Sequence, residues 1–175
     1  ISPADLENGA DAVAAMKIVR YQHEQFSPSR PILPTQSSDG QTYSTKFLAG
    51  AIKDIEVGFK SEFLPTDKIN AQGTINIAPE HVGEVGITHI ILDGGALGMF
   101  QINSSGEFVA FAPALVGSIS PRPLKAVEDL SVFNDLVFGN FGLASATFNI
   151  FFGYTLTETN VTVYTGIPLM IKIGN

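Results

Sequence analysis

The sequence predicts an all-β domain, a β-sandwich or jelly-roll-like fold, with an N-terminal helical and extended arm. Two observations lead to this prediction. Apolar and polar residues alternate over several short segments, and turn residues separate these segments. No cysteine is present among the 175 residues, which excludes a disulfide framework. A chain of this length buries enough surface to fold without such crosslinks. Residues 1–41 are the predicted arm and strap, and residues 42–175 the predicted sandwich.

The first 25 residues have the pattern of a helical arm. Ser2 is placed to cap a helix, Pro3 suits its first turn, and Asp5 lies near its positive end. Apolar residues follow at helical spacing, so we expect a helix over residues 3–20.

The same arm carries the side chains that we expect to mediate assembly, which are Val13, Met16, Ile18, Val19 and Tyr21. From Lys17 onward the pattern also fits a strand, with Val19 and Tyr21 on one face and Ile18 and Arg20 on the other. Such an apolar stripe has to be buried against another surface. Docking on its own domain and docking on the next subunit, by strand addition or as a helix in a groove, both stay open.

An extended strap is predicted over residues 27–41. Pro28, Pro31 and Pro34 enforce extended or polyproline backbone, and the following Ser-Ser-Asp-Gly sequence favours a turn. At about 3.1 Å per residue the proline-rich part could span roughly 20 Å. We therefore expect a strap that joins the arm to the body.

The body has the pattern of a sandwich of about eight or nine strands. Residues 69–77 alternate in steps of two, as do residues 55–59, and the apolar run Val85–Leu92 predicts a central strand. Turn residues at Asn103–Glu107 and Thr157–Asn160 predict two hairpins. Further strands are expected at residues 99–102, 108–112, 132–138, 147–156, 161–164 and 167–173.

The charge balance argues against a polyanionic partner. The chain has 10 Lys and Arg against 17 Asp and Glu, so its net charge is −7, and no nucleic-acid partner is expected. Between residues 69 and 171 the only basic residues are Arg122 and Lys125, beside eight acidic ones. Few charges are thus available to guard strand edges. The surface is interpreted either as that of a neutral soluble module or as one covered by copies of the same chain.

No motif of catalysis, cofactor binding or metal binding is recognisable. His23, His81 and His89 lack metal-ligand spacing, so we expect His81 and His89 to be structural or hydrogen-bonded. Nucleophile elbows and phosphate-binding loops are not found in the sequence either. Adjacent Phe151 and Phe152 place one ring in the core and one against a second layer or a neighbour. An enzyme is the least expected class, and no cofactor or metal is expected.

One stretch of the body resembles a known class of protein. Residues 75–83 read Ile-Asn-Ile-Ala-Pro-Glu-His-Val-Gly before an aliphatic strand, and Phe151–Leu156 and Val163–Tyr164 flank a later turn. In their general sequence pattern, residues 69–173 resemble the β-sandwich modules of large secreted or surface proteins of Gram-negative bacteria. The resemblance implies an extracellular location and an accessory, adhesive or structural role, and it implies no catalytic residue.

The leading hypothesis for function is a secreted structural subunit that self-associates through its arm, with an extracellular fibre as one form of the assembly. The alternative is a glycan- or surface-binding module of an adhesin. A viral coat-like jelly roll is a third interpretation, although the arm lacks the usual excess of basic residues. Because the chain begins at Ile1, we expect that a leader has been removed. No uninterrupted apolar run reaches the roughly 18 residues of a membrane span.

Overall fold

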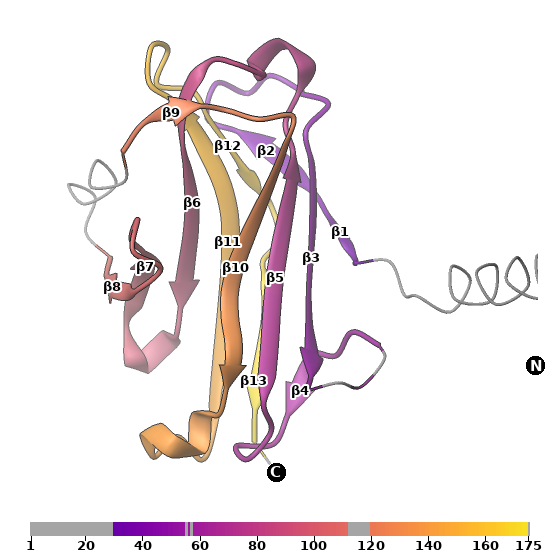
Figure 1. The fold of residues 1–175 in the computed structure, drawn as a ribbon, viewed down its shortest axis with the longest axis vertical. Helices are drawn as coiled ribbons and strands as arrows, with labels where there is room; N and C mark the ends of the chain where they lie inside the picture. The colour runs from indigo at the N-terminus through magenta and orange to yellow at the C-terminus, as the bar shows by residue number, and fades with distance from the viewer. Residues whose placement is uncertain (1–29, 55, 57, 112–119, 175) are drawn as a thin grey trace, which may run out of the picture.

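A computed structural model describes residues 30–54, 56, 58–111 and 120–174. The predicted helix over residues 3–20 lies outside these residues, as do the predicted assembly residues Val13, Met16, Ile18, Val19 and Tyr21. The described residues form two packed β-sheets (Figure 1), which confirms the predicted all-β sandwich.

The smaller sheet has four antiparallel strands in the order β1-β3-β5-β10. These are β1 (Ile32–Leu33), β3 (Lys46–Lys53), β5 (Ile69–Asn76) and β10 (Val127–Leu136). Its two edges are therefore β1, near the beginning of the described chain, and β10. In β5 the apolar residues face the core and the polar residues face outward, as the alternation predicted.

The larger sheet has nine strands, and its main path is β2-β12-β11-β6-β7-β8. β11 pairs with β12 along Gly153–Thr155 and with β13 along Ala146–Ile150. Two short strands thus pair with different parts of one long strand. β4 adds to β13 and β9 adds to β6. The strands are β2 (Thr35–Ser37), β4 (Glu62–Phe63), β6 (Val85–Asp93), β7 (Met99–Ile102), β8 (Phe108–Ala110), β9 (Arg122–Pro123), β11 (Ala146–Leu156), β12 (Thr162–Thr165) and β13 (Leu169–Ile173).

Both predicted hairpins and the predicted central strand are confirmed. β7 and β8 flank the turn at Asn103, and β11 and β12 flank the turn that ends at Asn160. β6 lies between β11 and β7 in the larger sheet. Three short 3₁₀ helices complete the described structure, namely η2 (Pro79–His81), η3 (Gly95–Leu97) and η5 (Phe138–Phe141).

The predicted strap is extended, but it is part of the sandwich. β1 pairs with the smaller sheet and β2 with the larger one, so the chain crosses between the two layers at Pro34. Proline cannot donate a backbone hydrogen bond, but its carbonyl group can accept one. Pro31 accepts from the Ala49 N–H at 3.1 Å and Pro34 from the Gly166 N–H at 2.8 Å. These bonds hold the strap on both sheets.

The strand predicted at residues 55–59 is wrong for the residues that the structure describes there. Asp54 adopts a turn with φ of +43°, and Gly58 has φ of +115°, so the chain bends where a strand was expected. The strand of this region is β3, which precedes the bend. Phe59 packs over Gly50 of β3, where a side-chain Cβ would overlap its ring. Phe59 thus covers the outer face of the smaller sheet instead of forming a strand.

Candidate functional site

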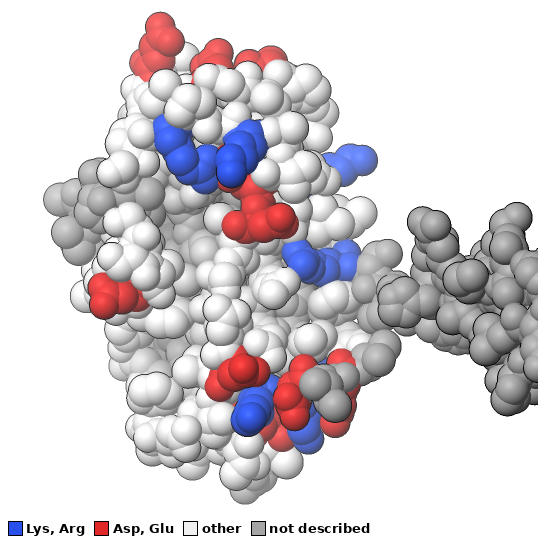
Figure 2. All heavy atoms as spheres, viewed as in Figure 1, with Lys and Arg blue, Asp and Glu red and all other residues white. Residues whose placement is uncertain are grey.

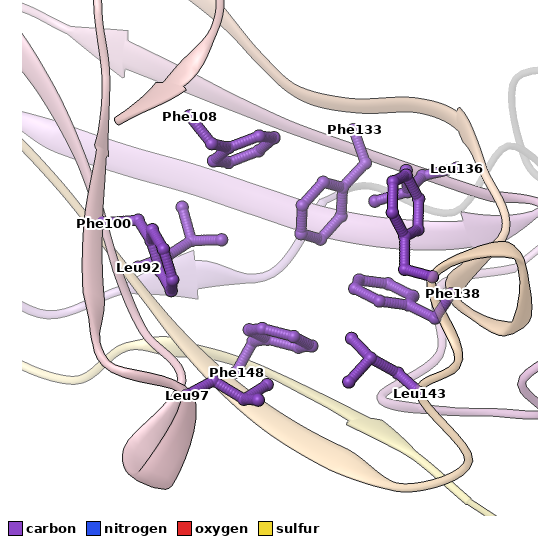
Figure 3. Close-up of a pocket in the computed structure, with 10 residues that line it drawn as sticks. Leu92, Leu97, Phe100, Phe108, Phe133, Leu136, Phe138, Leu143 and Phe148 are labelled. Atoms are coloured by element: carbon purple, nitrogen blue, oxygen red, sulfur yellow. The ribbon is translucent and has the colours of Figure 1, made fainter. Parts of the chain in front are cut away.

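An open apolar pocket lies at one side of the sandwich. Its volume is about 320 Å³. Figure 3 shows side chains from both sheets around it. The lining residues that the structure describes are all leucine or phenylalanine: Leu92, Leu97, Phe100, Phe108, Phe133, Leu136, Phe138, Phe141, Leu143 and Phe148.

The pocket forms where the larger sheet extends past the edge of the smaller one. β6, β7 and β8 lie beyond β10 (Figure 1), and their inner face carries Leu92, Phe100 and Phe108 into the pocket. β10 and the η5 helix supply the opposite wall. Because no strand of the smaller sheet lies beyond β10 among the described residues, the pocket opens at this side.

Irregularities in β10 aim its side chains into the pocket. The pairing of β10 with β5 shifts register between Ser131 and Phe133 and again between Phe133 and Leu136. Asp135 has φ of +49°, and its N–H donates to Asn70 Oδ1 at 2.9 Å. Such bulges turn a strand locally and redirect its side chains. They place Phe133 and Leu136 on the pocket wall.

The floor of the pocket is an aromatic cluster. The rings of Phe138 and Phe148 stack with centroids 4.9 Å apart, and Phe133 meets Phe138 edge to face at 5.4 Å. All three side chains are buried. The rim differs, because Phe108 is 42% exposed and Phe141 is 69% exposed. The pocket therefore has a fixed floor and a rim of aromatic side chains in water.

Two strand edges flank the opening. Within the described residues β10 pairs only with β5, and β8 pairs only with β7. Their other edges present backbone N–H and C=O groups that a further strand could use. The pocket can therefore bind an apolar group, and the edge beside it can bind an extended backbone. Among the described residues, no acid, base or hydroxyl side chain lines the cavity.

A second hollow, of about 270 Å³, lies on the outer face of the larger sheet. Phe152 is buried in the core, and Phe151 lines this outer hollow, as expected for adjacent residues of one strand. Tyr164 and Thr162 line it as well. His89 also lines it, and its Nε2 is 2.8 Å from Thr155 Oγ1. Burial lowers the pKa of His89 to about 4, so the ring is neutral at pH 7.

His81 belongs to a buried hydrogen-bond network at the opposite end of the sandwich. Its Nδ1 is 2.7 Å from the Tyr154 hydroxyl, which is also 2.9 Å from Thr45 Oγ1. The Ala78 N–H donates to Thr45 Oγ1 at 3.2 Å. Burial raises the pKa of Tyr154. Both described histidines are thus hydrogen-bonded, as the sequence analysis favoured, and no three His, Asp or Glu side chains gather as metal ligands in the described ranges.

Charged side chains leave much of the surface uncovered. On the face seen in Figure 2 they form separate small groups near the upper end, the middle and the lower end, with uncharged surface between them. The Arg122 guanidinium donates to both Glu128 carboxylate oxygens at 2.7 Å. Lys53 pairs with Asp67 at 3.0 Å. Several of the few charges are therefore used within the molecule.

Sequence reasoning did not find the pocket. The predicted assembly residues lie outside the described part of the chain, so the structure does not test whether they reach it. The one sequence signal was the high phenylalanine content of 13 residues, and those that line the pocket are Phe100, Phe108, Phe133, Phe138, Phe141 and Phe148. No helix in the described residues is long and apolar enough to cross a membrane.

Comparison of the chain with protein-family models, with curated proteins and with solved structures finds no match. The function is therefore inferred from the residues and their geometry alone.

Proposed function

We propose that this protein is a non-enzymatic, secreted structural subunit that self-associates, and that the apolar pocket is the site of association. The proposal places it outside the cell or at a cell surface, with an extracellular fibre as one form of the assembly. The observation that carries it is the pocket with its exposed aromatic rim beside an edge of β10 that pairs with no other strand in the described part of the chain.

Burial of the exposed rim side chains contributes a favourable free energy of association. A large apolar side chain contributes about 1.5–3 kcal/mol when it is fully buried. Leu97 is also exposed, at 43%, beside Phe108 and Phe141. Covering the exposed parts of these three side chains contributes about 3 kcal/mol before the entropic cost of association. A contact of this size needs further contributions, which hydrogen bonds along a strand edge can supply.

The proposal includes no catalytic step. The pocket is lined by hydrocarbon, and the buried polar groups elsewhere are held by internal partners. His81 and Tyr154 bond to each other, and Glu128 accepts from Arg122 and from the Lys125 N–H. These contacts support a structural interpretation of the polar residues.

The test is the oligomeric state of the full chain and of one rim variant. Sedimentation velocity and light scattering over a range of concentrations should show assemblies for the unmodified protein. Phe141→Asp should weaken them by about tenfold or more in dissociation constant, because it places a charge in the apolar contact. Val82→Asp is the matched control, since Val82 is 42% exposed and precedes β6 at the end away from the pocket. A full chain that stays monomeric at high concentration rejects the proposal.

The hollow on the outer face of the larger sheet favours a second candidate, a glycan- or surface-binding module. Phe151 and Tyr164 offer aromatic rings there, next to the polar groups of His89 and Thr162. Sugar rings stack on aromatic faces and hydrogen-bond to such groups. A glycan screen with unmodified protein and with Phe151→Ala tests this candidate. Binding that the variant loses while circular dichroism stays unchanged supports it.

A further inference from the structure

We propose that the pocket receives residues 17–21 of a second copy of this chain, added as a strand along the free edge of β10 with Val19 and Tyr21 directed into the pocket. This inference rests on the proposed function and specifies its contact. It selects the strand interpretation of this segment over the helical one, and docking on the next subunit over docking on the same domain.

The edge of β10 and the segment have matching patterns. The pocket lies inward of β10, and water lies on the other side of the sheet. An added strand therefore needs apolar side chains on alternate residues. Val19 and Tyr21 supply these toward the pocket, with Lys17 at the beginning of the same face, while Ile18 and Arg20 face the solvent. A tyrosine ring suits a pocket walled by phenylalanine, because contacts between aromatic rings contribute more favourable free energy than burial alone.

Asp93, Glu107 and Asp135 each stand next to a lining residue in the sequence but do not line the pocket themselves. Each accepts a local hydrogen bond, Asp93 from the Gly95 N–H, Glu107 from Asn103 Nδ2 and Asp135 from Asn70 Nδ2. Within the described residues none of the three forms an ion pair with Lys or Arg. The segment brings Lys17 and Arg20. Opposite charges favour encounter and orientation between two copies more than they raise affinity.

The position of β1 favours a second copy over the same chain. The described chain begins at Arg30 next to β1, whereas the pocket lies at β10, the other edge of the smaller sheet. A path within one molecule has to cross three strand spacings, about 14 Å, so residues 22–29 would have to lie over the outer face of the smaller sheet. The β5 part of that face is polar, and Arg30 itself donates to Gln72 Oε1 there at 2.8 Å. A donor segment at one edge and a receptor pocket at the opposite edge give a head-to-tail contact, which repeats without closing.

Disulfide trapping tests the contact directly, because the chain has no cysteine of its own. Full-length Val19→Cys and full-length Phe141→Cys are mixed and oxidised, and Val19→Cys with Val82→Cys is the control mixture. A disulfide requires Cβ atoms about 3.5–4.5 Å apart, so it reports contact. We expect a crosslinked heterodimer in the first mixture, in excess over the control. Equal yields in both mixtures overturn the inference.

A double variant, Val19→Cys with Phe141→Cys in one chain, separates the two docking modes. Crosslinked dimers and longer ladders support docking on a second copy. A crosslink confined to single chains at all concentrations overturns it in favour of docking on the same domain.

The strand register has its own test in the full chain. Val19→Asp and Tyr21→Asp should each weaken assembly by about tenfold or more in dissociation constant, and Ile18→Asp should weaken it less, because Ile18 faces away from the pocket. Equal effects of all three variants overturn the strand arrangement. If Phe141→Asp weakens assembly but no Val19 crosslink forms, the proposed function stands and this inference fails. A chain that never assembles overturns both.

Discussion

Gly153 brings β11 and β12 close together. A Cβ at this position would lie 2.9 Å from the Val163 carbonyl oxygen and 3.1 Å from Tyr164 Cβ. Both distances are shorter than ordinary van der Waals contact, and the first involves backbone of the paired strand. A glycine in an apolar strand indicates a bulge or a close approach of another backbone. The structure shows the close approach.

We therefore predict that Gly153→Val destabilises the fold although valine favours strands. Overpacking of this kind costs about 2 kcal/mol in the free energy of unfolding, which thermal melting by circular dichroism would report as a lower Tm. Asn149→Val is the matched control, since Asn149 lies on the same face of β11 and is only half-buried. A Tm at or above that of the unmodified protein would show that the glycine is incidental.

His89 makes stability depend on pH. Burial lowers its pKa from 6.5 to about 4, so the unfolded chain takes up a proton at a pH where the folded protein does not. The stabilisation is full above pH 6.5 and is lost as the pH falls toward 4. Between pH 7 and pH 5 we predict a loss of about 2 kcal/mol in the free energy of unfolding.

Urea unfolding at the two pH values measures this loss. His89→Gln retains a polar group for Thr155 but cannot titrate, so its free energy of unfolding should change less between pH 7 and pH 5. If the variant and the unmodified protein lose equal stability, other groups account for the dependence.

At the scale of elements, the strap sets where the folded body begins. Because β1 and β2 pair with both sheets, residues 30–37 belong to the body although they precede the predicted boundary at 41. We predict that deleting residues 1–26 leaves the Tm almost unchanged. Deleting residues 1–41 should lower the free energy of unfolding by about 3 kcal/mol, since partly buried Leu33 and two sets of edge hydrogen bonds are lost. Similar Tm values for both deletions would contradict this account.

Strands with one solvent-exposed face were predictable from alternation, whereas β3, which is apolar on both faces, was not. β5 was recognised because apolar residues such as Ile75 alternate with polar ones such as Thr74. β3 was missed because Leu48, Gly50 and Ile52 are as apolar as the core residues between them. Phe59 covers its outer face at Gly50, and local sequence patterns do not predict this contact. The strand expected nearby, at residues 55–59, was inferred from alternation alone.

Local sequence patterns could not predict the pocket, for a related reason. Its walls come from β10 and η5 on one side and from β6, β7 and β8 on the other. The bulges that aim Phe133 and Leu136 depend on pairing with β5 and on the Asn70 contact to Asp135. Alternation predicted that such rings would be buried, but it could not show that the sheets end at different places.

At the scale of the whole molecule, stability rests on the apolar core between the sheets. The core contains large, fully buried side chains from both sheets, such as Phe47 and Phe152. We predict that chelation by EDTA leaves the Tm unchanged, because a core of this size needs no metal and no cluster of three His, Asp or Glu is found in the described residues. A drop of many degrees that added Ca²⁺ or Zn²⁺ reverses would contradict this prediction.

The crossing of the strap at Pro34 bears on how the protein would carry mechanical load. A pull on the N-terminal segment first meets β1, which has only two paired residues in the smaller sheet. A lone edge strand of that length would peel open one hydrogen bond at a time under tension. Here the next three strand residues are anchored in the larger sheet. Tension applied to the N-terminal segment would therefore be shared between both layers of the sandwich.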